Sequence, residues 1–301
     1  MKRLTNAALV AAIALSGSAT ANEMYLDLAA FGGNFHDGKL LFGGTEIDVT
    51  PIDDNSTTGV FSEFGFNQLL ATSLYDMTDG DVLGSFYDTN IPSELAAAGV
   101  PASGTALDGL TTVSLVLPAC GAQCDIDALS PLAPPLDSDA EGFIRSWDLQ
   151  VAYHFDGTLT AGGPIYTGGT FDVYFNSLVD DSYDALAFSG VLTGSTINAA
   201  NLDLFFDITY AVDGFLNIDN GSGTFTDAAD MIADGGVPTL ALDTNVNPPI
   251  PTADQLLVVG TNAVRQTTLD GSITAKIPEP SSLALLGLGL LGLGRAARRK
   301  A

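Results

Sequence analysis

The sequence predicts an all-β protein: an antiparallel β-sandwich or jelly-roll-like body with few short helices, followed by a separate apolar helix. Three observations carry this prediction. Short segments alternate apolar with polar residues. Turn-forming Gly, Asp, Asn and Thr residues recur about every 8 to 15 positions. Helical periodicity is nearly missing from the body of the chain, which favours packed β-strands over a helical fold.

Residues 1–21 have the pattern of a secretory signal peptide. Lys2 and Arg3 form the basic start, an apolar stretch follows, and small residues end the segment. The apolar stretch is too short to span a membrane. We therefore expect cleavage between Ala21 and Asn22 and an exported mature chain.

Residues 22–277 form the predicted body, an acidic β-rich secreted domain. The chain has 36 acidic and 10 basic residues. One acid and six bases lie outside the body, which leaves 35 acids, four bases and a net charge of −31. Such a surface repels nucleic acid, so no nucleic-acid partner is expected. A proline-rich loop near 125–142 is a candidate division within this body.

Several predicted strands place alternate apolar side chains on one face. The three clearest strands have the following inward residues: Leu149, Val151, Tyr153 and Phe155; Phe171, Val173 and Phe175; and Leu202, Leu204, Phe206, Ile208 and Tyr210. Further strands are expected over 186–197, 268–277 and 111–118.

Two short helices interrupt this pattern. One is expected after Ser93 as N-cap and ends at Gly99. The second occupies 228–236, where two glycines supply the stop. The segment 61–77 fits both an alternating strand and a helical stripe, and the sequence leaves the two open.

The two cysteines, Cys120 and Cys124, lie close together in the exported body. In an oxidising compartment the favoured interpretation is a disulfide that closes a small loop. So short a loop adds little to global stability. Two thiols with only two histidines in the chain make a poor zinc site.

The segment 137–148 offers a candidate calcium loop. Asp137, Asp139 and Glu141 occupy alternate positions, a glycine follows, and Asp148 takes the twelfth position. Alternate oxygen ligands on a flexible loop suit calcium, the one cofactor the sequence suggests. The order of acids departs from the usual pattern, so a solvated acidic loop stays as the alternative.

A second acidic loop contains Asn217, Asp219 and Asp227. Its oxygen-bearing side chains also suit calcium. The Asn-Gly and Gly-Thr pairs in this segment are explained equally well as turns between strands.

Sequence motifs for catalysis are missing: the chain has no GxSxG elbow, no HExxH and no phosphate-binding loop. His36 and His154 each stand near an acid but have no identifiable nucleophile, and His154 is expected to face away from the core. We therefore predict a protein that is not an enzyme. Because paired carboxylates can hydrolyse glycans, a glycoside hydrolase-like activity remains the alternative.

Aromatic residues could contact carbohydrate. Trp147, Tyr153, Tyr166 and Tyr174 would stack on sugar rings if they lined one exposed face. Aromatic residues in strands more often belong to the core. The sequence leaves a calcium-dependent carbohydrate-binding module open on this ground.

The last segment, 278–301, combines a Pro-Glu-Pro, an apolar stretch and a basic end. Residues 281–297 are 17 in number, which gives a helix of about 25 Å, at the lower edge for crossing a bilayer. The basic residues behind it suit the cytoplasmic side. We expect a transmembrane-like helix that holds the exported body at the inner membrane.

The stretch "IPEPSSLALLGLGLLGLGRAARRK" closely resembles the PEP-CTERM sorting signal. A Pro-Glu-Pro, a short Gly/Leu-rich span and an Arg-rich end occur in that order behind a signal peptide. The matching residues are Pro278, Glu279, Pro280, Arg295, Arg298 and Arg299.

The resemblance implies a route for the protein. Proteins of this family are substrates of exosortase, a membrane-embedded enzyme of Gram-negative bacteria that make extracellular polysaccharide. For this chain, the resemblance implies passage through an inner-membrane intermediate, processing near the Pro-Glu-Pro, and delivery to the cell surface or extracellular matrix. The expected role of the body is a non-catalytic one in exopolysaccharide, biofilm or flocculation.

Overall fold

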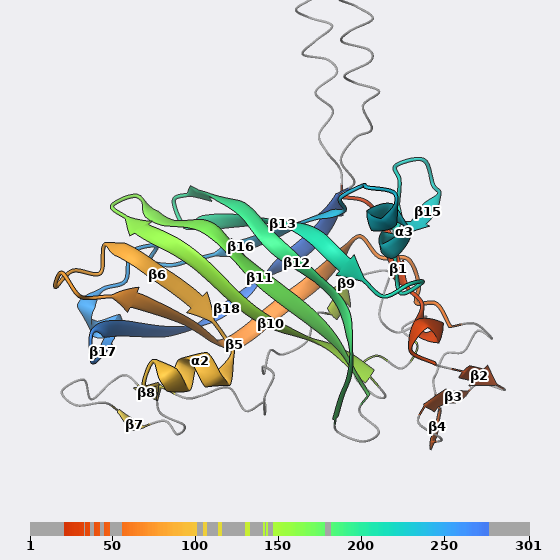
Figure 1. The fold of residues 1–301 in the computed structure, drawn as a ribbon, viewed down its shortest axis with the longest axis horizontal. Coiled ribbons are helices and arrows are strands. Elements are labelled where there is room, and N and C mark those ends of the chain that lie inside the picture. Colours follow the sequence, from red (N-terminus) through yellow and green to blue (C-terminus); the bar gives the residue numbers. More distant parts are fainter. Residues whose placement is uncertain are drawn as a thin grey trace, which may run out of the picture.

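One antiparallel sheet of ten strands dominates the computed structural model (Figure 1). The structure describes residues 21–32, 34–36, 39–42, 45–48, 56–100, 105–106, 114–115, 130–132, 141, 143, 147–177 and 182–276. The sheet curls until β18 pairs with β5, so that eight strands form a closed ring. In ring order these strands are β5 (Glu63–Asp76), β6 (Gly84–Thr89), β10 (Trp147–Thr160), β11 (Gly163–Ser177), β12 (Ser182–Asn198), β13 (Asn201–Ala211), β16 (Thr239–Asn245) and β18 (Asn262–Lys276).

Alternation along the strands fills the ring with apolar side chains, as the sequence predicts. The inward positions of β10 and β11 and the first four of β13 are all buried. Aromatic rings meet in the interior: Phe171 contacts Phe206 edge to face with centroids 5.3 Å apart, and Phe155 lies 5.4 Å from Phe206. Such pairs add to the stabilisation that apolar burial provides.

Tyr210 is the exception on β13, since its side chain is 46 % exposed. The register between β12 and β13 shifts at this point: Ser189 faces Tyr210, and Gly190 faces Ile208. This bulge inserts an extra residue and reverses the alternation beyond Ile208. The prediction that Tyr210 faces the core is therefore wrong.

The prediction of a mostly β, antiparallel protein with few short helices is confirmed, but the two-layer sandwich is not what forms. A single sheet curls instead, and its register shifts occur in β10–β11, β11–β12, β12–β13 and β18–β5. Bulges bend strands and increase their twist, which lets a long sheet curl on itself. Apolar alternation alone does not distinguish these two arrangements, because either one buries a single face of each strand.

A small second sheet covers one end of the interior. It consists of β1 (Met24–Leu26), β14 (Leu216–Asp219) and β15 (Phe225–Asp227), next to α3 (Ala228–Ala233) and the 3-10 helix η1 (Leu28–Phe31). Their apolar side chains join the same core as the ring. Phe31 of η1 stacks on Phe175 of β11 with centroids 4.4 Å apart.

Both predicted short helices form, and the N-cap of the first one differs from the prediction. The segment 228–236 contains α3, and the Asp227 side chain caps its start by accepting from the Ala229 amide. The first helix, α2 (Pro92–Ala97), begins at Pro92 instead of after Ser93, and Ile91 is its N-cap. Proline suits the first helical position because its fixed φ is already helical and no amide is lost. The ambiguous segment 61–77 forms strand β5.

The remaining elements lie outside the ring. Strands β9 and β17 extend the large sheet at β5 and β18, and β2–β3–β4 and β7–β8 form separate small sheets. No helix within the described ranges is both long and apolar enough to traverse a bilayer. The bounds of these elements are β2 (Asn34–His36), β3 (Lys39–Phe42), β4 (Thr45–Asp48), β7 (Thr105–Ala106), β8 (Ser114–Leu115), β9 (Ser130–Leu132), η2 (Ala253–Gln255) and β17 (Leu257–Val259).

Gly190 on β12 gives a test of the tightly curled part of the ring. A Cβ atom there would lie 2.4 Å from the Asp207 carbonyl oxygen and 2.6 Å from the Phe171 ring. We expect Gly190→Ala to lower the free energy of unfolding by about 1–3 kcal/mol, measured in urea. Gly194→Ala, on the same strand with no atom within 4 Å of the new Cβ, is the matched control. Equal losses in both variants would contradict the close packing at Gly190.

Candidate functional site

The two ends of the folded body meet at one point. The Asn22 amide donates to the Ala275 carbonyl at 3.0 Å, and the Asn22 side-chain amide donates to the Asp219 carbonyl. Ala275 is fully buried near the end of β18. The predicted cleavage site between Ala21 and Asn22 therefore lies beside the end of β18 at Lys276, two positions before Pro278.

Several sequence-predicted site residues are not among those that the structure describes. The disulfide and the contribution of Asp137 and Asp139 to the candidate calcium loop stay predictions. The structure also gives no geometry for the sorting segment. The residues outside the described ranges are Cys120, Cys124, Asp137, Asp139, Pro278, Glu279, Pro280, Arg295, Arg298 and Arg299.

Two members of the candidate calcium loop are described, and both make contacts within the protein. Glu141 is 3 % exposed with a positive φ of 50°, and its carbonyl accepts from the Trp147 indole at 2.9 Å. The Asp148 carboxylate accepts from Asn176 at 2.8 Å and from Gln150 at 3.4 Å. Burial raises the pKa of Asp148 against the effect of these bonds.

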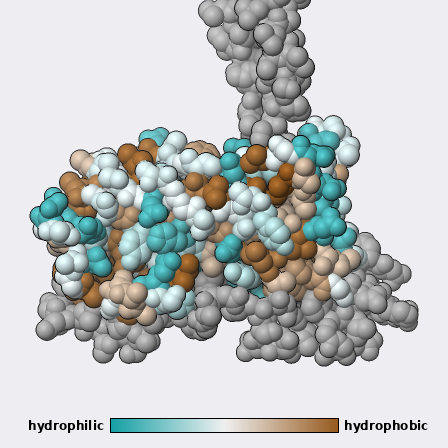
Figure 2. Space-filling view, in the orientation of Figure 1, coloured by the Kyte–Doolittle hydropathy of each residue, from teal (hydrophilic) through white to brown (hydrophobic). Residues whose placement is uncertain are grey.

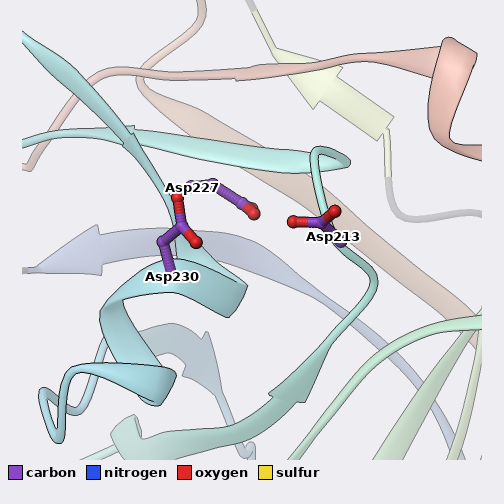
Figure 3. A group of neighbouring side chains, drawn as sticks. All are labelled: Asp213, Asp227 and Asp230. Carbon is purple, nitrogen blue, oxygen red and sulfur yellow. The ribbon is translucent and has the colours of Figure 1, made fainter.

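An acidic cluster lies where α3 meets the turn after β13. The carboxylate oxygens of Asp213, Asp227 and Asp230 lie within 4.8 Å of one another (Figure 3). Burial raises the pKa of Asp227, and the neighbouring charges of Asp213 and Asp230 add to this. Three carboxylates at this separation could hold a hard cation such as calcium.

Backbone amides already bind the Asp227 carboxylate. One oxygen accepts from Gly214 at 2.9 Å and the other from Ala229 at 3.3 Å. The other two members of the second calcium loop serve the turns around them. Asn217 donates to the Gly214 carbonyl, and Asp219 accepts from Gly223, both at 2.9 Å. Of the three residues proposed for that loop, Asp227 alone belongs to the acidic cluster.

A polar cluster inside the ring has no counterpart in the sequence predictions. Arg265 of β18 is 4 % exposed and donates to the carbonyls of Pro248 and Asn247 at 3.1 and 3.3 Å. Asp88 of β6 accepts from the Tyr166 hydroxyl. Arg265 is one of only four basic residues in the body and occupies an alternating strand, and this is the signal that could have revealed it.

Burial controls the ionisation of this polar cluster. It raises the pKa of Asp88 to about 6, although Ser73, Tyr166 and the charge of Arg265 act in the opposite direction. Burial and the nearby Asp88 charge raise the pKa of Tyr75 to about 12. Burial, again with Asp88, raises the pKa of Tyr166 well above its ordinary value.

His154 faces outward from β10, as the alternation predicts. Its Nδ1 lies 2.7 Å from Glu94 Oε2, its Nε2 lies 3.3 Å from Asp156 Oδ1, and its ring stacks on Tyr87. Burial opposes the imidazolium, but the hydrogen bond and charge of Glu94, assisted by Asp156, outweigh this and raise the pKa of His154. The contact ties α2 to the ring.

Most aromatic residues proposed to contact sugars are inaccessible. Trp147, Tyr153 and Tyr166 are each at most 6 % exposed, so the interpretation as an exposed stacking face is wrong for these three. They belong to the core because alternate strand positions face the ring interior. Two aromatic side chains that are exposed, Phe205 and Tyr210, lie on β13.

His154 provides a test by pH. The charged pair with Glu94 stabilises the fold fully below the unfolded pKa of about 6.5, and this contribution is lost as pH rises through the higher folded pKa. We expect His154→Gln to lower the free energy of unfolding by about 0.5–1 kcal/mol at pH 5.5 and by less at pH 9, because both side chains are partly exposed. Chemical denaturation at the two pH values measures the difference.

Glu94→Gln is the matched control for the histidine pair. It should reproduce the pH dependence of His154→Gln, and the double variant should add little to either change. A loss in His154→Gln that is the same at both pH values would contradict the ion pair.

Comparison with known protein families gives one match. The description of the matching family is the PEP-CTERM protein-sorting motif, and it covers residues 276–300. Searches of curated proteins and of solved structures gave no match. The match begins at Lys276, where β18 ends, so the folded body and the motif adjoin. The motif implies an exported protein that exosortase processes and sorts to the cell surface. The chain thus carries a PEP-CTERM protein-sorting motif in residues 276–300.

Proposed function

We propose that this protein is a non-catalytic component of the extracellular matrix, delivered to the cell surface through its sorting motif. In this proposal the leader is cut after Ala21, and residues 278–301 hold the body at the inner membrane until exosortase acts. The acidic curled sheet is then the part that works in the exopolysaccharide layer, in biofilm or flocculation.

The adjacency of body and motif is the observation that carries this proposal. The match begins at Lys276, and the Asn22–Ala275 hydrogen bond holds the start of the body beside its end. A single cut near Pro278 would therefore release the whole folded sheet. The net charge of −31 over residues 22–277 favours a soluble, hydrated protein after release.

A substitution within the motif tests sorting. We expect replacement of Pro278, Glu279 and Pro280 by three alanines to leave the full-length protein in the inner-membrane fraction. Immunoblots of membrane, surface and medium fractions give the measurement, in strains with and without an exosortase. Alanines at Ser281, Ser282 and Leu283 are the matched control, because they change three adjacent residues and keep the Pro-Glu-Pro. Unchanged processing of the first variant would overturn the sorting route.

The outer face of β13 provides a test of the matrix role. Apolar residues lie scattered among polar ones on the face shown in Figure 2. Phe205 is 36 % exposed and Tyr210 is 46 % exposed, and such rings can stack on sugars. We expect the double variant Phe205→Ala/Tyr210→Ala to bind exopolysaccharide at least about fivefold more weakly in affinity electrophoresis, given roughly 0.5–1.5 kcal/mol for each of the two aromatic contacts.

Leu83→Ala/Val258→Ala is the control for this variant, because both residues are exposed but not aromatic. Equal retention by the two double variants would contradict sugar contact through β13. Release of new reducing ends from purified exopolysaccharide by the wild-type protein would favour the glycoside hydrolase-like alternative.

The acidic cluster supports a second candidate, a calcium-dependent module. Asp213, Asp227 and Asp230 carry the necessary oxygens. If calcium binds there, a chelator lowers the melting temperature of the wild type but not of Asp213→Asn/Asp230→Asn. These two residues are exposed and leave the Asp227 cap in place. An unchanged melt removes this candidate.

A further inference from the structure

The interior of the ring contains a cavity of about 120 Å³. All eight ring strands contribute to its lining, and most of the lining side chains are aromatic or aliphatic. An apolar cavity of roughly 150 Å³ holds a benzene molecule. The space in this protein is somewhat smaller, so it suits at most one small ring or a short branched chain.

Two polar atoms at this cavity have no hydrogen-bond partner among the described residues. One is Arg265 Nε, a donor on a side chain that is 4 % exposed. The other is Asp88 Oδ1, an acceptor that makes no hydrogen bond of good geometry, although the neighbouring Ser73 hydroxyl acts on the same carboxyl group. Both residues line the cavity. A buried polar atom without a partner destabilises the protein, so a group that satisfies it gains affinity on binding.

The charges around these atoms favour a neutral guest. Arg265 supplies one positive charge and Asp88 one carboxyl group that shares the low-dielectric interior. An anionic guest would be repelled by the Asp88 carboxylate, and a cationic guest would be repelled by the Arg265 guanidinium. A neutral hydroxyl avoids both conflicts, since it has a proton to donate and lone pairs that accept.

We propose that the cavity is a binding site for a small, neutral, mainly apolar molecule with one hydroxyl group, of the phenol type. The ring of the guest contacts the aromatic wall formed by residues such as Phe86, Tyr153 and Phe206, and its hydroxyl is directed to Arg265 and Asp88. This site is independent of the sorting route and of any matrix role.

Phenol, toluene and benzoate are the probes for this site, titrated into the purified full chain by isothermal calorimetry. We expect saturable phenol binding with a Kd on the order of 1 mM or tighter. Toluene, which has no hydroxyl, should bind about tenfold more weakly, because the two polar atoms stay unsatisfied. Benzoate should bind more weakly than phenol at pH 7.5.

A cavity-filling variant with a matched control completes the test. Ala71 lines the cavity, so Ala71→Leu should remove the saturable phenol heat. Ala241→Leu makes the same change between the inward residues Leu240 and Leu242, on the outer face, and should bind phenol like the wild type. Circular dichroism verifies that both variants fold.

Four results would overturn the proposal. They are no saturable phenol binding by the wild type, equal binding by Ala71→Leu and Ala241→Leu, equal affinity for phenol and toluene, and tighter binding of benzoate than of phenol. The first result would leave water as the occupant of the cavity, and the last would indicate an anion site.

Discussion

The pairing of β5 with β18 is the constraint on which the rest of the fold depends. It joins residues about two hundred positions apart and runs from Glu63–Thr274 to Asp76–Asn262. Without it the sheet would have two free edges and an open apolar face. With it, the inward side chains of eight strands share one enclosed core. The loop entropy of joining such distant segments must be offset by that burial, so closure and core formation are coupled.

Closure also brings unlike polar groups together. Arg265 comes from β18, Tyr75 from β5 and Asp88 from β6, and each of these strands is a neighbour of another in the ring. A charged side chain at an inward strand position normally destabilises a core. Here the guanidinium has two carbonyl partners and the carboxyl has a tyrosine partner, which offsets part of that cost. The remaining unsatisfied atoms, Arg265 Nε and Asp88 Oδ1, make part of the interior polar.

Local patterns in the sequence were sufficient for five of the eight ring strands, β10, β11, β12, β13 and β18. The alternation of β10 and β11 and the short helix over 228–236 are properties of a few adjacent residues, and they were predicted correctly, whereas the Asp227 cap of α3 was not predicted. The exposed position of Tyr210 was not predicted, because the bulge opposite Ser189 depends on the pairing with the partner strand. The choice between a sandwich and a curled sheet depends on the long-range register of β5 and β18, which no local pattern contains. The cluster at Arg265 follows from that register and was missed for the same reason.

The Asn22–Ala275 hydrogen bond has a consequence for the chemistry of maturation. While the leader is attached, the donor is an ordinary neutral amide. Cleavage after Ala21, which we propose, would turn it into an α-ammonium group with a pKa of about 8. A charged donor makes a shorter and stronger hydrogen bond to the same carbonyl. In the proposed route, removal of the leader would thus strengthen the hydrogen bond that holds the last strand, close to the proposed processing site at the Pro-Glu-Pro.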